Sequence, residues 1–103
     1  MSLSFEQKLA IFEDSQYGME RYSIKPNKTN FRYKGKVIVR EMREGSPVAY
    51  VWGKDIAEFT DKYKIDERGW ILVHDFTENE IRDLLVQVLL MRDKLTMQKN
   101  NER

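Results

Sequence analysis

Apolar residues recur every third or fourth position near both ends of the chain and every second position between them. At the beginning, Ser4 and Gln7 have the spacing of a capping box, in which each side chain hydrogen-bonds the backbone of the other residue. The apolar residues that follow have helical spacing. The pattern predicts a short helix over residues 5–15 that ends at Gly18.

The middle of the chain alternates apolar and polar residues, as strands with one buried face do. Segments rich in glycine, proline, asparagine and aspartate separate these runs and predict turns. Gly35 lies inside the second run, where it would mark a bulge or a bend. We predict strands over residues 19–25, 31–42, 48–52 and 70–76, with turns at residues 26–30, 43–47 and 66–69.

Helical spacing returns between the third and fourth predicted strands. Ile56, Phe59 and Tyr63 are three and four residues apart, which predicts a short amphipathic helix over residues 54–63. A helix between two strands is the one connection here that would allow a parallel strand pair. The shorter links favour antiparallel hairpins.

A second capping-box pattern, Thr77 with Glu80, precedes a long apolar run and predicts a helix that reaches at least Leu95. Together the elements predict an α+β fold. It would contain a small antiparallel sheet of about four strands, a short N-terminal helix, a short middle helix and a long C-terminal helix. We expect one domain over residues 1–97 and a polar tail over residues 98–103 that frays.

The last helix is more apolar than packing on one sheet requires. From Ile81 to Met91, eight of eleven residues are apolar, whereas one packing partner needs a stripe roughly 100° wide. Either the first helix or a second copy of the chain could cover the additional surface. We favour a second copy, because two-fold pairing of identical helices gives a closed arrangement. The predicted homodimer interface contains Val86, Leu89 and Leu90.

The total charge conceals an uneven distribution. The chain has 18 Lys and Arg against 17 Asp and Glu, a net charge of +1. Residues 21–52 nevertheless contain eight basic and two acidic residues, a local excess of +6. Aromatic residues alternate with these cations, and single-stranded nucleic acids bind to cations beside aromatic rings. The candidate nucleic-acid contacts are Lys28, Phe31, Arg32, Tyr33, Lys34, Lys36 and Arg40.

An ordinary half-buried sheet produces the same alternation, with aromatic rings inside and lysines and arginines in water. The two interpretations differ in where Phe31 and Tyr33 face. If these rings are buried against a helix, base stacking is excluded, and only phosphate binding by the cations remains.

The chain contains no cysteine and a single histidine, His74, which excludes disulfides, thiol catalysis, thiolate zinc sites and multi-histidine metal sites. A catalytic His74 would need Glu78 or Glu80 as its partner across the strand–helix junction, but a lone histidine among apolar residues is more often a packed one, and we favour that interpretation. The motifs of nucleotide-binding glycine loops and of serine nucleophiles are missing. We expect no cofactor, no metal and no enzymatic activity.

Apolar runs are too short to span a membrane, and the first residues lack the pattern of a secretory signal. We therefore expect a cytoplasmic protein that does not enter membranes. The favoured function is a non-enzymatic interaction or assembly module, homodimeric through the C-terminal helix and open to a protein partner. The alternative is a nucleic-acid-binding accessory protein that uses the basic hairpin over residues 21–43.

Overall fold

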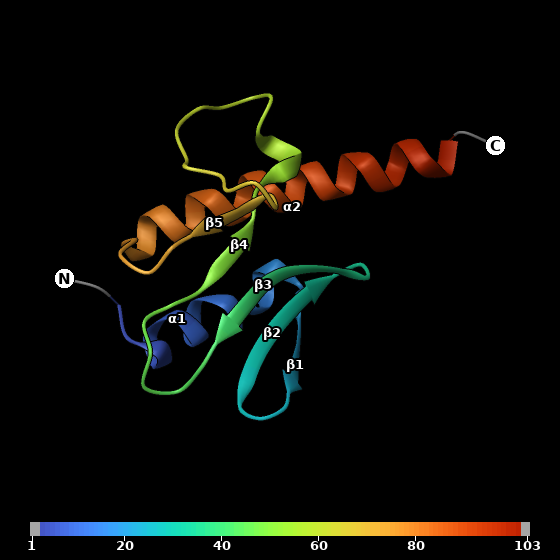
Figure 1. The fold of residues 1–103 in the computed structure, drawn as a ribbon. Coiled ribbons are helices and arrows are strands. Elements are labelled where there is room, and N and C mark those ends of the chain that lie inside the picture. The colour runs from blue at the N-terminus through green and yellow to red at the C-terminus, as the bar shows by residue number, and fades with distance from the viewer. Residues whose placement is uncertain (1–2, 102–103) are drawn as a thin grey trace.

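A five-stranded antiparallel sheet, with its strands in chain order, forms the centre of the α+β fold (Figure 1). The computed structural model describes residues 3–101, with side chains described as far as Met97. The strands are β1 (Glu20–Ile24), β2 (Lys28–Tyr33), β3 (Lys36–Met42), β4 (Tyr50–Trp52) and β5 (Trp70–Leu72). The helices are α1 (Phe5–Phe12) and α2 (Glu78–Asn101), with short 3-10 turns η1 (Ser15–Tyr17) and η2 (Lys54–Ile56).

Both predicted capping boxes are formed. The Ser4 hydroxyl accepts from the Gln7 N–H at 3.1 Å, and the Gln7 side chain accepts from the Ser4 N–H at 2.9 Å. Thr77 and Glu80 exchange the same two bonds at 3.2 and 2.9 Å. α1 is shorter than predicted, because η1 replaces its last turn and ends at Gly18, whose φ of 63° is left-handed.

The single strand predicted over residues 31–42 is wrong, because a tight turn divides this segment into β2 and β3. Lys34 and Gly35 have φ values of 50° and 83°, and positive values at both central residues are typical of two-residue hairpin turns. Apolar and polar residues alternate on both sides of this turn, so the period of two did not reveal it. The sheet therefore contains five strands instead of about four.

Irregular pairing in β3 affects which of its side chains face the core. The register between β2 and β3 shifts twice, and Glu41, in one of these shifts, has a φ of 70°. An extra residue in one strand of an antiparallel pair bends the strand and disturbs the alternation of its side chains. As a result the consecutive residues Ile38 and Val39 are both fully buried.

The helix predicted over residues 54–63 is also wrong, because only η2 is helical there. No side chain caps η2 at Gly53, and the chain continues to β5 as a loop. Ile56 and Tyr63 are buried, but Phe59 between them is 70% exposed. The helical spacing of these three residues therefore did not correspond to one buried face.

The last strand is shorter than the predicted range of residues 70–76. β5 ends at Leu72, and the Val73 N–H bonds the Ala49 carbonyl at 2.9 Å before the chain turns toward α2. β4 and β5 are antiparallel, with Trp52 opposite Trp70. The parallel pair that a middle helix would have allowed is therefore absent from the sheet that residues 3–101 form.

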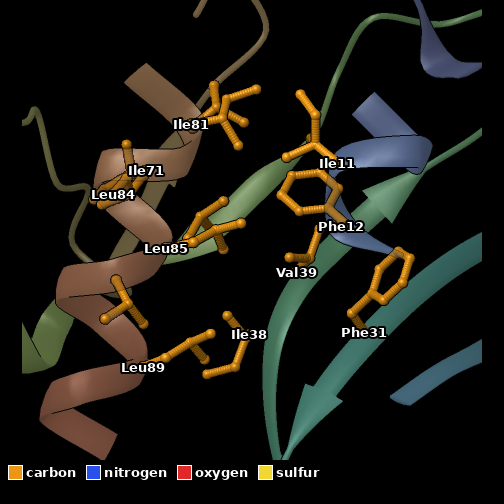
Figure 2. Packing of buried hydrophobic residues seen from close by; sticks show 14 of the residues in the cluster. Ile11, Phe12, Phe31, Ile38, Val39, Ile71, Ile81, Leu84, Leu85 and Leu89 are labelled. Atoms are coloured by element: carbon orange, nitrogen blue, oxygen red, sulfur yellow. The ribbon is translucent and has the colours of Figure 1, made fainter. Parts of the chain in front are cut away.

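One apolar core lies between the sheet and the two helices (Figure 2). Phe12 of α1 packs against Phe31 of β2 with the ring centroids 5.7 Å apart. Leu85 and Leu89 of α2 point toward the strands. The buried apolar residues are Ile11, Phe12, Tyr17, Phe31, Ile38, Val39, Met42, Ala49, Val51, Ile56, Tyr63, Ile71, Val73, Ile81, Leu84, Leu85, Val88 and Leu89.

α2 is much longer than the part of it that covers the sheet. Its 24 residues span about 36 Å at 1.5 Å per residue, and its C-terminal end extends beyond the strands (Figure 1). The predicted tail over residues 98–103 falls partly within this helix, which continues to Asn101. Residues 102–103 lie outside the described residues.

Candidate functional site

Of the two aromatic rings selected in the predicted basic hairpin, one is fully buried and the other is partly buried. Phe31 is fully buried in the core. Tyr33 packs against the core, and its hydroxyl donates to the Asp93 carboxylate of α2 at 2.7 Å. The Lys34 ammonium donates to the same oxygen of Asp93, also at 2.7 Å. The burial of Phe31 excludes base stacking by that ring, whereas the partly buried Tyr33 ring is fixed against α2 by its bond to Asp93.

Carboxylates from other segments offset much of the positive charge of the hairpin. Asp93, Glu13 and Glu20 lie outside the basic segment, and their three negative charges reduce the local excess of +6 to +3. Lys36 forms no ion pair within the described residues, and its ammonium lies 3.6 Å from the ring centroid of Trp52. The ion pairs of this region are Arg21–Glu13, Lys28–Glu41, Arg32–Glu20, Lys34–Asp93 and Arg40–Glu41.

We expect Asp93 to couple the hairpin to α2 in a pH-dependent way. Hydrogen bonds from Lys34 and Tyr33 lower the pKa of Asp93 below its ordinary value. Its contribution to the unfolding free energy is therefore complete above the unfolded pKa of about 3.9 and disappears as the pH falls through the lower folded pKa. Urea unfolding should show Asp93→Asn less stable than the original chain at neutral pH, with the difference closing in acid. A constant difference would contradict this coupling.

A shallow hollow lies on the sheet between β3, β4, β5 and the preceding loop. Trp70 forms part of its floor, and the Arg40 guanidinium lies 5.1 Å from a Trp70 ring centroid. The Asp66 carboxylate is directed into its own loop, where it accepts the N–H groups of Arg68 and Trp70 at 2.9 Å each. Because three acidic and two basic side chains line it, the hollow lacks the excess of positive charge that a polyanion requires. It measures about 590 Å³ and is lined by Arg40, Glu41, Tyr50, Asp66, Glu67, Arg68 and Trp70.

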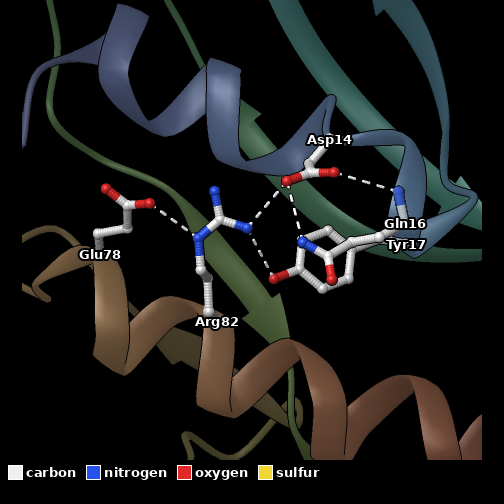
Figure 3. Close-up of polar contacts among 5 residues, drawn as sticks. All are labelled: Asp14, Gln16, Tyr17, Glu78 and Arg82. Carbon is white, nitrogen blue, oxygen red and sulfur yellow. Dashed lines mark hydrogen bonds and ion pairs between the residues drawn. The ribbon is translucent and has the colours of Figure 1, made fainter.

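Arg82 joins α2 to the segment between α1 and β1 (Figure 3). Its guanidinium donates to Glu78 at 2.8 Å and to both Asp14 and the Tyr17 hydroxyl at 3.0 Å. The bond to Glu78, with those to Tyr17 and Asp14, raises the pKa of Arg82. Because each acceptor lies within the fold, this cluster holds η1 in place against α2.

His74 does not meet the glutamates that a catalytic role would require. Its carbonyl accepts from the buried Lys8 ammonium at 3.1 Å, and its Nδ1 lies 3.9 Å from Asp75. Within the described residues it forms no ion pair with Glu78 or Glu80. Burial lowers the pKa of Lys8, and the nearby charge of Asp75 opposes this effect. The arrangement attaches α1 to the turn before α2.

The outer surface of α2 carries an exposed apolar stripe, which we define as Val86, Leu90 and Met97. These side chains are 49%, 55% and 64% exposed. Spacings of four and eleven residues, close to one and three helical turns, place them on one side of the helix. Leu89, the third residue of the predicted interface, is only 7% exposed and packs in the core of its own chain. Leu89 therefore offers little surface to a second copy, because α2 uses that side to cover the sheet, and the exposed residues of the predicted interface are Val86 and Leu90.

A groove runs beside the stripe, between α2 and the η2 loop. Asp55 fixes η2 against the helix by accepting from the Trp52 indole at 2.9 Å and from Arg92 at 3.0 Å. The loop then presents the 70% exposed Phe59 beside the groove. The groove measures about 700 Å³, and its lining is Lys54, Asp55, Ile56, Glu58, Phe59, Gln87, Leu90, Met91, Lys94 and Leu95.

Sequence reasoning missed two residues of this surface. Met97 could have been found, because it follows Val86 by eleven residues and so lies on the same side of a helix. No local pattern in the sequence indicated that Phe59 would be exposed, because its spacing from Ile56 and Tyr63 predicted a buried helical face.

No helix within residues 3–101 combines the length and apolar composition of a membrane span. The described residues also contain no group of three or more histidine, aspartate or glutamate side chains placed to hold a metal ion. Comparison with protein-family models, curated proteins and solved structures finds no match to this chain. A functional proposal therefore rests on the surfaces described above.

Proposed function

We propose that this protein is a non-enzymatic assembly module whose α2 helix pairs with α2 of a second copy. The observation that carries this proposal is the exposed apolar stripe of Val86, Leu90 and Met97. Exposed apolar residues on one side of a helix, beside a groove, are typical of a protein interface. Leaving such side chains in water forgoes about 1.5–3 kcal/mol for each one that could be fully buried.

The intramolecular alternative explains only part of the apolar excess of α2. α1 and η1 both contact α2, so the first helix does share in covering it. Nevertheless Val86 and Leu90 remain about half exposed. A second copy would bury them, and two-fold symmetry would supply the same stripe from both chains. The lack of cysteine fits a reducing compartment, and we propose the cytoplasm as the location.

Leu90→Glu should convert the dimer to a monomer, because it introduces a carboxylate at the centre of the stripe. We expect the dissociation constant to rise about 30-fold or more, the effect of removing a residue that contributes about 2 kcal/mol to an interface. Size-exclusion chromatography with light scattering over a micromolar concentration series measures this change.

Ala10→Glu provides the matched control, because Ala10 is an exposed apolar residue on α1, away from the stripe. This variant should remain dimeric. A monomeric original chain throughout the micromolar range would refute the proposed function, and so would a Leu90→Glu variant that dimerises as well as Ala10→Glu.

A further inference from the structure

We infer that two copies pair their α2 helices antiparallel, with Phe59 of each copy closing over α2 of the partner. This inference rests on the proposed function and adds the orientation, the register and a second contact element. The residues that carry it are the stripe, the groove beside η2 and two charged side chains of α2.

Charge complementarity selects the antiparallel orientation. Asp83 and Lys94 are both exposed, and neither forms an ion pair within the described residues. They are eleven residues apart, close to three helical turns, so they lie on the same side of α2. A parallel pair would place like charges opposite each other, whereas an antiparallel pair places Asp83 opposite Lys94 of the partner subunit.

The apolar residues select the same register. The midpoint between Asp83 and Lys94 lies next to Val88, and so does the midpoint between Val86 and Leu90. One two-fold axis near Val88 therefore brings the opposite charges together and also packs the Val86–Leu90 part of the two stripes together, with Met97 of each copy further along α2. In this register Val86 of the partner subunit lies opposite Met91, which lines the groove.

The groove explains why the η2 loop takes part. Lys94, Gln87 and Leu90 lie on its α2 side, and Phe59 lies on its loop side. A partner helix placed along the stripe therefore extends toward Phe59, whose ring is 70% exposed without it. The bond of Asp55 to Arg92 fixes the η2 loop beside α2, so Phe59 is positioned before the partner binds. We call the contact of Phe59 with α2 of the partner the clasp.

Site-directed crosslinking tests the orientation directly, because the chain has no cysteine of its own. We would prepare Asp83→Cys and Lys94→Cys as separate chains and treat each alone, and an equilibrated mixture, with a short bis-maleimide. The mixture should give a covalent dimer. Each variant alone should remain uncrosslinked, because its two thiols would be about 17 Å apart along the helix axis, eleven residues at 1.5 Å.

Phe59→Ser tests the clasp, with Ile24→Ser as its matched control. Ile24 is also an exposed apolar residue, 42% exposed, but it lies at the end of β1. We expect Phe59→Ser to raise the dissociation constant about tenfold, as loss of a well-packed interface side chain does, and Ile24→Ser to leave it unchanged.

The outcomes separate this inference from the proposed function. A monomeric original chain would overturn both. A dimer in which Asp83→Cys crosslinks to itself, or in which the mixture does not crosslink, would overturn the antiparallel register and leave α2 assembly standing. Equal effects of Phe59→Ser and Ile24→Ser would overturn the clasp. Crosslinking only in the mixture, together with a selective effect of Phe59→Ser, would support the complete arrangement.

Discussion

Phe12→Ala should lower the unfolding free energy by about 3–5 kcal/mol, the usual cost of removing a buried aromatic ring. Phe12 is fully buried and joins α1 to the sheet through its contact with Phe31. Domains of this size are stable by only about 5–15 kcal/mol, so this one change would remove a large share of the total. Urea unfolding should show a lower midpoint with an unchanged slope.

Phe59→Ala is the matched control, because it removes the same ring from a position that is 70% exposed. Both variants would be compared in the Leu90→Glu background, so that self-association does not contribute to the measured stability. We expect the control to change the unfolding free energy by less than about 0.5 kcal/mol. Similar losses in both variants would contradict the burial of Phe12.

Gly69→Ala should lower the unfolding free energy by about 2–4 kcal/mol, from backbone strain and overpacking together. Gly69 has a φ of 94°, a conformation that L side chains rarely adopt. A Cβ atom there would lie 2.8 Å from Lys54 Cβ and 3.0 Å from the Trp52 ring. Neither neighbour can move freely, because Trp52 is hydrogen-bonded to Asp55 and the Cβ of Lys54 is attached directly to the η2 backbone.

Gly35→Ala separates the two contributions to this loss. Gly35 also has a positive φ, 83°, but no atom lies within 4 Å of the position of its Cβ. It should therefore show backbone strain alone, about 1 kcal/mol. Thermal and urea unfolding of both variants would measure the difference. A loss in Gly35→Ala as large as in Gly69→Ala would show that crowding around Trp52 is unimportant.

The candidate surface was only partly predictable from the sequence. The excess of apolar residues in α2 correctly indicated surface beyond the need of one sheet, and Val86 and Leu90 are indeed exposed. Leu89 follows Val86 by three residues, which in a helix is the spacing of neighbours. Whether Leu89 is buried against the sheet or exposed depends on the orientation of α2 about its own axis relative to the strands.

The basic hairpin shows that a charge count along the sequence is also an incomplete guide to the folded surface. Counting residues 21–52 gave a local excess of +6, but counting along the chain cannot include a carboxylate from another element. Asp93 binds Lys34 across 59 positions of sequence. The segment is therefore less basic than the count indicated, and Phe31 is inaccessible, because of contacts that form only in the folded chain.

The sequence by itself determined the features that depend on neighbours within a few residues. Both capping boxes formed as predicted, and so did the α+β class, because side-chain capping and hydrophobic periodicity act over one or two turns or strands. Tertiary structure decided which apolar face of α2 is covered, and it left Phe59 exposed beside the groove. These outcomes depend on packing between distant segments, which local spacing does not specify.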